Sequence, residues 1–496
     1  MKENIKAQLG NKFFIIAVFC MYLIMIWFSY TYKMDPYLWF DEAGQFWISK
    51  GLNHDSAPYS SIGNIWDVIK NNQDYNLDPG GFSILLHFWS MISNHFIWLR
   101  SLPFLLFVCT IIGWIYLTYQ WTNNKNTSLL LGFVPLIIPM IYNEAFEVRA
   151  YSMEVLGCIL VCIATDKLQK KVSYKRLVMW SSLVAIFMTS RYSFIIVTFV
   201  FSTYVLYLIY KSNKSRKEQI IMITIYSLPI LLSLGYVYFF AMRHQNPEVS
   251  TLHYLPYLSE NIKIVLRIAS LRHIFYLLLI SWGAYELRNS WIINKYIGLI
   301  YITIVTNVLF VILSLLGYHP WSGDTTRCIS MIVLIIISFT AILGEGLRVI
   351  NKYVDFRLIV LCFICIRLLS LYKFDVKNVR HRENSLTHYQ QINAIGKVYV
   401  DRWESPCMRY QFEYGKLVND MNYPNMFTFA VFRPHRLAIV ETEKRVTLSD
   451  YYKTQPDLDD LEQYSVLIVP ELFDYKQKVP LMWNSINNQN RVWIKK

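Results

Sequence analysis

Long apolar runs, separated by short loops that carry charge, repeat along most of the chain. The runs have about 16 to 25 residues each, and an α-helix needs about 20 apolar residues to cross the roughly 30 Å hydrocarbon core of a bilayer. The pattern predicts a polytopic α-helical membrane protein with about 11 spans. We expect the spans at residues 12–31, 101–120, 128–143, 151–166, 177–190, 193–210, 219–241, 268–286, 291–317, 329–344 and 356–373.

The charge of the loops sets the expected topology, because Lys and Arg gather on the cytoplasmic side of membrane proteins. Three basic clusters fall between predicted spans, at residues 167–176, 211–217 and 348–357. With a cytoplasmic N-terminus, all three are cytoplasmic only if the apolar segment 81–97 does not make a full crossing. Among its apolar residues this segment also contains polar ones, including His87, Ser93, Asn94 and His95. We therefore expect a half-inserted or re-entrant helix there.

The same topology places the loop at residues 32–80 and everything after about residue 374 outside the cytoplasm. From residue 375 the apolar spans stop, charge becomes frequent, and short strand-like runs alternate with a helical stretch at 406–420. The sequence predicts a transmembrane domain at 1–374 and a small extracytoplasmic α/β domain at 375–496. The expected strands lie at residues 397–400, 437–440, 464–469 and 491–494.

The composition narrows the class of protein further. Of 496 residues, 54% are hydrophobic and 17% are charged, and the mean hydropathy is +0.30. These values exclude a disordered chain and argue against an ordinary soluble domain. The formal net charge is +14, which cytoplasmic Lys and Arg explain without nucleic acid. Membrane lipid or an anionic lipid-linked substrate accounts for the remainder, so we expect no nucleic-acid partner.

Two adjacent carboxylates, Asp41 and Glu42, follow the first predicted span in an aromatic setting. Neighbouring residues point in different directions, so one carboxylate can reach a reacting centre while the other holds a neighbouring group. The alternative is a helix cap, with Asp41 preceding a helix that begins at Glu42. Asp78 opens a Pro-Gly-Gly turn whose backbone amides can approach a phosphate. The alternative there is a helix-start turn with Asp78 as the cap.

Several basic residues share the predicted outer side with these carboxylates. Arg149 follows Glu144 and Glu147, and Arg191 lies midway in a stretch long enough for two short helices. Snorkelling or capping explains each of them singly. Together, the acids suit an acceptor hydroxyl or a divalent ion, and the arginines suit a phosphate or diphosphate. The other basic groups expected on this side are Lys263, Arg267, His319 and Arg327.

These motifs resemble those of the GT-C superfamily of membrane glycosyltransferases, of the dolichyl-phosphate-mannose protein mannosyltransferase and aminoarabinose-transferase type. In that pattern the loop after the first span opens with Asp-Glu, here residues 41–42. An Arg-Ala-Tyr segment is matched by residues 149–151. Asp-Pro-Gly-Gly-Phe at residues 78–82 takes the place of a Pro-Pro-Leu motif, and a late Arg-Tyr is matched as Arg-Cys at residues 327–328.

The resemblance implies an inverting transfer of a sugar from a polyprenyl-phosphate donor to a hydroxyl of a glycan, lipid or protein outside the cytoplasm. Asp41 would be the general base, or a carboxylate that orients the acceptor or a divalent metal ion. Glu42 would support Asp41, and Asp78 would lie near the sugar or acceptor. The expected location is the inner membrane of a bacterium. The expected substrate-binding residues are Arg149, Tyr151, Arg191, Lys263, Arg267, His319 and Arg327.

Three other functions are compatible with parts of the pattern. A transporter or flippase of lipid-linked or anionic solutes predicts internal repeats and charges near the middle of the bilayer, and no repeat is evident. An O-antigen ligase or polymerase-like enzyme would need a large outer loop late in the chain, whereas the large loop here is the first one. A non-catalytic scaffold remains if the acidic pair only caps a helix.

Overall fold

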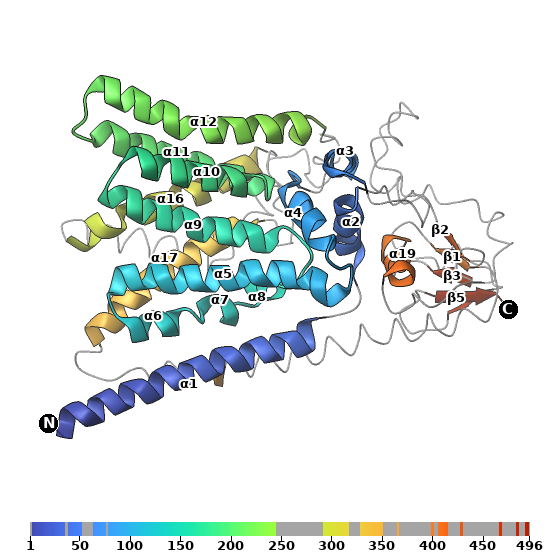
Figure 1. The fold of residues 1–496 in the computed structure, drawn as a ribbon, viewed down its shortest axis with the longest axis horizontal. Coiled ribbons are helices and arrows are strands. Elements are labelled where there is room, and N and C mark those ends of the chain that lie inside the picture. The colour runs from blue at the N-terminus through green and yellow to red at the C-terminus, as the bar shows by residue number, and fades with distance from the viewer. Residues whose placement is uncertain are drawn as a thin grey trace. The chain divides into compact units, whose positions relative to one another are not determined.

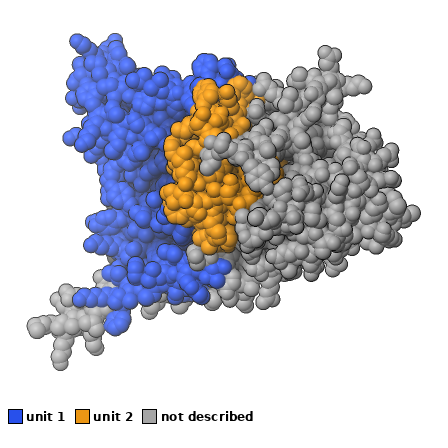
Figure 2. Space-filling view, turned by 45° about the vertical axis from the view of Figure 1, so that its right-hand side comes forward, with its two compact units in different colours: residues 1–31, 103–243, 253–373 blue, residues 32–102, 244–252, 374–496 orange. Residues whose placement is uncertain are grey.

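The structure is a computed structural model of the chain (Figure 1). It divides into two compact units, coloured in Figure 2, and each unit is described by itself. Unit 1 contains residues 1–31, 103–243 and 253–373, and unit 2 contains residues 32–102, 244–252 and 374–496. The structure describes residues 2–34, 38–51, 63–75, 78–244, 291–316, 328–350, 365–366, 398–400, 405–414, 427–429, 466–468, 483–485 and 492–495.

Unit 1 is built from helices, and α1, α5 and the short helix η1 also extend into unit 2. The helices are α1 (Lys2–Lys33), α5 (Phe96–Thr122), α6 (Lys125–Leu131), α7 (Val134–Ile137), α8 (Pro139–Glu144), α9 (Tyr151–Lys170), α10 (Tyr174–Met188), α11 (Tyr192–Lys211), α12 (Arg216–Phe240), η1 (Met242–His244), α16 (Trp291–Leu315) and α17 (Ile329–Ile350).

Four helices among the described residues are long and apolar enough to cross a membrane. They expose large apolar side chains such as Phe199, Leu231 and Leu232, which suit contact with lipid rather than water. The chain is therefore a helical protein with the elements of a membrane protein. The four helices cover Phe96–Thr122, Tyr192–Lys211, Arg216–His244 and Lys295–Leu315.

Helix α9 is the central helix of unit 1 and packs against α8, α10, α11, α16 and α17. Figure 1 shows it beside α10 and α11. Small residues permit this close packing, as is common between membrane helices. A Cβ atom added to Gly157 of α9 would lie 2.7 Å from the ring of Phe194 on α11. A Cβ on Gly298 of α16 would lie 2.5 Å from the Thr165 methyl group.

The predicted span at residues 128–143 is wrong as a single helix, because the chain forms α6, α7 and α8 there. Gly132 follows α6, and Pro135 and Pro139 lie in the first turns of α7 and α8. A proline has no amide hydrogen to donate and its ring clashes with the preceding turn, so each one starts a new helix. Helices cover the other predicted spans, except that 268–286 and, apart from residues 365–366, 356–373 lie outside the described part of the chain.

The helical part of unit 2 centres on α2, which packs against α3, α4 and α19. Phe46 of α2 lies 5.0 Å from the ring of Tyr410 on α19, measured between centroids, and the Trp47 indole donates to the Pro406 carbonyl at 3.0 Å. These contacts join two segments that are far apart in the sequence. The helices are α2 (Phe40–Ser49), α3 (Ile65–Tyr75), α4 (Gly81–Ser90) and α19 (Ser405–Glu413).

The segment 81–97, predicted as one half-inserted helix, is instead α4, a turn at residues 91–95 and the beginning of α5. The ten residues of α4 span about 15 Å, half the thickness of a hydrocarbon core. Helix α5 begins five residues before the predicted span at 101–120 and keeps Pro103 inside its first turns.

The strands of unit 2 form a five-stranded sheet with the order β2-β1-β3-β5-β4. β1 is parallel to β2 and β3, whereas β5 is antiparallel to β3 and β4. β1, β3 and β5 overlap stretches expected as strands, β2 and β4 were not expected, and the expected strand at 437–440 lies outside the described residues. The strands are β1 (Val398–Val400), β2 (Phe427–Phe429), β3 (Val466–Ile468), β4 (Trp483–Ser485) and β5 (Val492–Lys495).

Candidate functional site

The acidic pair of the first loop lies in the first turn of α2. The helix begins at Phe40 and Trp39 is its cap residue, so the alternative in which Asp41 caps a helix that begins at Glu42 is not observed. Glu42 instead satisfies one exposed backbone donor of the helix start, because its Oε2 accepts the Trp39 amide at 3.2 Å. Both carboxylates also face the positive end of the helix dipole, which stabilises negative charge.

Glu42 forms a buried ion pair with Arg100, at the beginning of α5. Arg100 Nη1 lies 2.5 Å from Glu42 Oε1, and Nη2 lies 2.9 Å from Oε2. The guanidinium therefore binds the carboxylate through two parallel hydrogen bonds. Burial of either charge alone would cost several kcal/mol of hydration, so each needs the other. The pair fixes the first turn of α2 against α5.

The sequence prediction missed Arg100, although a signal was present. Arg100 is the only charged residue between Asp78 and Lys125. A lone arginine in such an apolar stretch must snorkel to the interface or find a carboxylate. The structure shows the second outcome. Asp41, next to Glu42 in the chain, is half-buried in the same helical turn, and the ion pair beside it holds its backbone in place.

Asp78 is buried and shapes the turn before α4. Its Oδ1 accepts the Gly80 amide at 2.8 Å, and its backbone carbonyl accepts the Asn72 side-chain amide, also at 2.8 Å. Gly80 has φ of 89°, a conformation that glycine adopts without strain, and it is Gly80 rather than Asp78 that directly precedes α4. The Gly80 amide is thus bound to Asp78, which supports the turn alternative over an amide open to phosphate.

A second group of charged side chains lies in unit 1, around the start of α9, and we name it the Tyr151 cluster. The Arg191 guanidinium lies 4.1 Å from the Tyr151 ring centroid, and the Arg149 guanidinium lies 5.3 Å from it. Each distance is within the range of a cation–π interaction. Three of the predicted substrate-binding residues are therefore neighbours. The Tyr151 cluster consists of Glu144, Glu147, Arg149, Tyr151, Glu154 and Arg191.

Glu154 is the member of this cluster that the sequence analysis missed, because it lies inside a run treated as a membrane span. Its side chain is fully buried on α9. Oε1 accepts hydrogen bonds from Ser193 at 2.5 Å and from Ser330 at the start of α17, and Oε2 lies 3.1 Å from Arg191 Nε. Glu154 thereby joins the first turns of α9, α11 and α17 and holds Arg191 against Tyr151.

Glu144, at the end of α8, is buried beside Glu147. Burial first, and then the negative charge of Glu147, raise the pKa of Glu144 to about 9, although Arg191 and Arg149 oppose the shift. Glu144 is therefore protonated at neutral pH.

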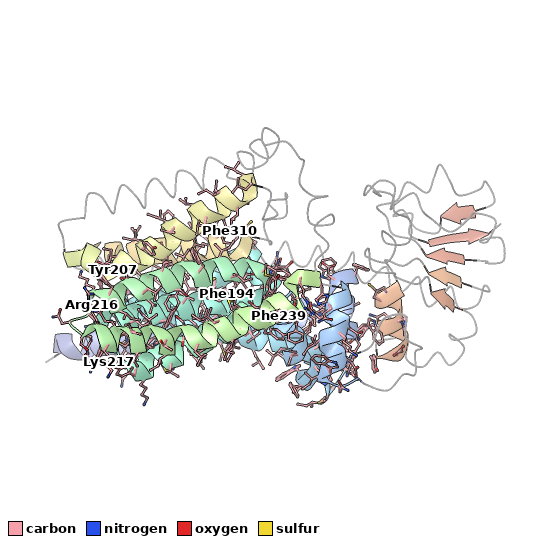
Figure 3. All side chains as sticks on the ribbon, turned by 90° about the horizontal axis from the view of Figure 1, so that it is seen from above. Phe194, Tyr207, Arg216, Lys217, Phe239 and Phe310 are labelled. Atoms are coloured by element: carbon pink, nitrogen blue, oxygen red, sulfur yellow. The ribbon has the colours of Figure 1, made fainter. Side chains whose placement is uncertain are left out.

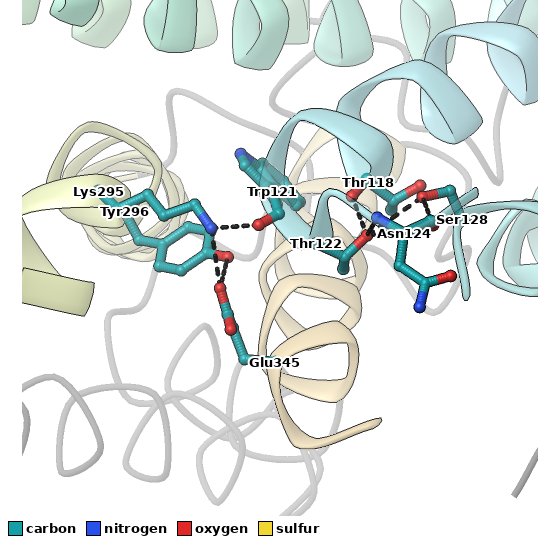
Figure 4. A network of polar contacts seen from close by, with 8 residues as sticks. All are labelled: Thr118, Trp121, Thr122, Asn124, Ser128, Lys295, Tyr296 and Glu345. Carbon is teal, nitrogen blue, oxygen red and sulfur yellow. Dashed lines mark hydrogen bonds and ion pairs between the residues drawn. The ribbon is translucent and has the colours of Figure 1, made fainter. Parts of the chain in front are cut away.

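The opposite ends of the unit 1 helices carry a separate polar network, drawn in Figure 4. Lys295 of α16 lies 2.9 Å from Glu345 Oε1 of α17, and the Tyr296 hydroxyl donates to the same oxygen at 2.6 Å. Lys295 also donates to the Trp121 carbonyl at the end of α5. This network joins the ends of three helices, so its evident role is structural.

The predicted site residues that the structure describes are divided between the two units. Asp41, Glu42 and Asp78 belong to unit 2 and the Tyr151 cluster belongs to unit 1, so each is described within its own unit. Across the described ranges, no three His, Cys, Asp or Glu side chains come together as metal ligands would. The predicted residues outside the described part of the chain are Lys263, Arg267, His319 and Arg327.

The buried ion pair beside Asp41 and the paired arginines at Tyr151 are thus the two arrangements from which a function is inferred. Neither protein-family models nor curated proteins match the chain.

Proposed function

We propose that the protein is a GT-C-type glycosyltransferase, which moves a sugar from a polyprenyl-phosphate donor to an acceptor hydroxyl on the outer face of the membrane, with inversion. The observation that carries the proposal is the position of Asp41. It lies half-buried in the first turn of α2, directly beside the buried Glu42–Arg100 pair. A general base must be held within hydrogen-bond reach of its substrate, and a rigid helical turn is suited to that task.

In the proposed reaction, Asp41 accepts the proton of the acceptor hydroxyl. At the same time the oxygen of that hydroxyl attacks the anomeric carbon of the sugar. The bond between that carbon and the phosphate oxygen breaks, and polyprenyl phosphate leaves with the bonding electrons. Glu42 keeps the turn in place through Arg100. The alternative role for Asp41 is to orient the acceptor through a divalent ion. The sugar-side role of Asp78 remains part of the proposal, although its side chain already holds Gly80.

The leaving phosphate gains negative charge, so it needs cations more than it needs a proton. We assign this role to Arg149 and Arg191, because both guanidiniums contact Tyr151 and two guanidiniums suit the oxygens of one phosphate. Four further substrate-binding residues, expected from the sequence, belong to the same proposal: Lys263, Arg267, His319 and Arg327.

The finer topology belongs to the same proposal: about 11 spans, a segment 81–97 that does not cross, an outer C-terminal α/β domain and a bacterial inner membrane. The basic loops support it. Lys170 and Arg176 flank the junction of α9 and α10, and Lys214 and Lys217 flank that of α11 and α12. Because these helices alternate in direction, both junctions lie at one end of unit 1. Figure 3 shows Tyr207, Arg216 and Lys217 together at that end.

The positions of the buried charges favour this function over a transporter. Transporters place charges near the middle of the bilayer. In unit 1, Glu154 lies in the first turn of α9, Arg191 immediately precedes α11, and Lys295 and Glu345 lie toward the opposite ends of α16 and α17. These described charges all lie toward helix ends, where a membrane-surface enzyme meets its substrates.

The proposal is tested with Asp41→Asn, which keeps the size of the side chain and removes the base. The donor is first identified by mass spectrometry of polyprenyl-phosphate sugars and surface glycans in cells with and without the protein. Purified wild type and variant are then assayed with that donor in nanodiscs. Loss of a general base lowers the rate by about 10²- to 10⁴-fold. Asp67→Asn on α3 is the matched control and should keep wild-type activity; full activity of folded Asp41→Asn rejects the base role.

A further inference from the structure

Helix α4 turns its polar side chains inward. Ser83, His87 and Ser90 are buried; the first two hydrogen-bond to α2, and Ser90 bonds to the residue that follows α2. The Gln45 amide donates to Ser83 Oγ at 2.5 Å, and His87 Nδ1 lies 2.6 Å from the carbonyl of α2's last residue. The Ser90 carbonyl accepts a hydrogen bond from the buried ammonium group of Lys50, the residue after α2, at 3.1 Å. A helix on the surface of a water-soluble protein has the opposite arrangement, with its polar face outward.

The outward face of α4 and of the following turn is apolar. Leu85 is 36% exposed, Phe88 50%, Met91 57% and Ile92 71%. The spacing of these residues places them along one side of the helix and its continuation. We name these four residues the apolar ridge. No Asp, Glu, Lys or Arg occurs from residue 79 to residue 99, so the ridge has no charged rim of its own.

Two tryptophans close the turn at the base of the apolar ridge. The rings of Trp89 and Trp98 stack with centroids 4.5 Å apart and an angle of 7° between their planes. The Trp89 indole donates to the Trp98 carbonyl at 2.7 Å, and the Trp98 indole donates to the Trp89 carbonyl at 2.8 Å. Both indole hydrogens are thus bound within the protein, as an apolar environment requires. Tryptophan is also enriched where proteins meet the membrane surface.

The apolar ridge is continuous in sequence with an element that suits the bilayer. After the turn, the chain enters α5, one of the four helices long and apolar enough to cross a membrane. Leu105 and Ile112 of α5 are exposed in the same way as the ridge residues. Hydrocarbon therefore accounts for both surfaces, since a water-facing ridge of this composition would be costly.

We propose that α4 and its turn form a lipid-embedded arm, with the apolar ridge in the hydrocarbon of the leaflet that receives the beginning of α5, and with the polar face holding α2. The arm ties the helix that carries Asp41 and Glu42 to the bilayer through side-chain hydrogen bonds. A charge placed in the ridge would favour withdrawal of α4 from lipid and would loosen α2. The inference does not depend on the proposed chemistry.

Photocrosslinking tests where the ridge lies. p-Benzoylphenylalanine replaces Ile92 in the full chain, in nanodiscs of phosphatidylethanolamine and phosphatidylglycerol, and mass spectrometry identifies the adducts. We expect adducts to lipid acyl chains. The matched control has the same probe in place of Lys70, an exposed residue of α3, and should give no acyl-chain adduct above background. Absence of acyl-chain adducts at residue 92, or adducts mainly to a second copy of the chain, overturns the proposal.

Hydrogen exchange tests the link between the ridge and α2. Phe88→Asp introduces a charge into the ridge, and Phe88→Leu keeps it apolar. In nanodiscs we expect faster exchange of the α2 amides in Phe88→Asp and wild-type exchange in Phe88→Leu. Equal α2 exchange in both variants overturns the role of the arm in holding α2. If Phe88→Asp fails to fold, the Ile92 crosslink, made in an otherwise unchanged protein, still decides whether the ridge meets lipid.

Discussion

Removing one partner of the Glu42–Arg100 pair should destabilise the protein far more than removing both. The side chains of Arg100 and Glu42 are 3% and 1% exposed, and two short hydrogen bonds join them. Arg100→Met would leave a buried carboxylate without its cation, and Glu42→Leu would leave a buried cation. Each single change should lower the free energy of unfolding by about 3 to 5 kcal/mol.

The double variant should recover most of that loss. Once both charges are replaced by apolar side chains, no ion remains to be stripped of water, and such replacements are often close to neutral. The coupling free energy, the difference between the double variant and the sum of the single variants, should therefore reach about 3 kcal/mol or more, at the upper end of the range for contacting residues. Unfolding by SDS in mixed micelles, followed by tryptophan fluorescence, supplies the four free energies of the cycle.

A matched pair provides the control. Lys214 and Glu218 are 3.4 Å apart in α12 and its preceding loop, with side chains 46% and 40% exposed. Exposed pairs of this spacing contribute about 0.3 to 0.5 kcal/mol, so their cycle should show little coupling. A coupling of less than about 1 kcal/mol for Glu42 and Arg100 would mean that water reaches the pair, and would refute the argument that it fixes the first turn of α2.

Two further predictions concern unit 1. The pKa of Glu144 rises from 4.5 to about 9 on folding, so its neutral form favours the folded state fully below pH 4.5 and this contribution is lost as pH rises through about 9. Glu144→Gln stays neutral and should flatten the fall in the free energy of unfolding between pH 6 and 9, which in wild type is at most about 1.4 kcal/mol per pH unit. Melting temperatures measured across this pH range check the prediction, and an unchanged pH profile would contradict it. Gly157→Ala should destabilise by about 1 to 3 kcal/mol, because its Cβ would meet Phe194 at 2.7 Å, whereas Gly235→Ala on α12 meets nothing within 4 Å and should stabilise. Equal melting temperatures for the two variants would show that α9 and α11 can move apart freely.

The sequence predicted the long helices well because their signal is local. The observed α9, α10, α11 and α12 each lie within a few residues of a predicted span, since an apolar run bounded by charged loops defines a helix without knowledge of its neighbours. The prediction failed at 128–143, where the apolar composition outweighed Pro135 and Pro139. A proline interrupts helical hydrogen bonding, and a hydropathy average does not include this effect.

The candidate sites were predictable only in part. Arg149 and Arg191 were expected on the same, outer side of the membrane, but their meeting at the Tyr151 ring depends on how α9 and α11 pack. Glu154 and Arg100 were missed because each is a single charge in an apolar run, and its partner lies far away in the sequence. Strands β2 and β4 have three residues each, so their pairing depends on neighbouring strands rather than on their own pattern.

The separation of Glu42 and Arg100 by 58 positions also has a consequence for biosynthesis. Synthesis proceeds from the N-terminus, so α2 emerges before the arginine that neutralises its buried carboxylate. The first turn of α2 therefore cannot reach its final arrangement until the beginning of α5 has been synthesised. Any shortened version of the chain that ends before Arg100 would lack this ion pair, even if it retained all of α2.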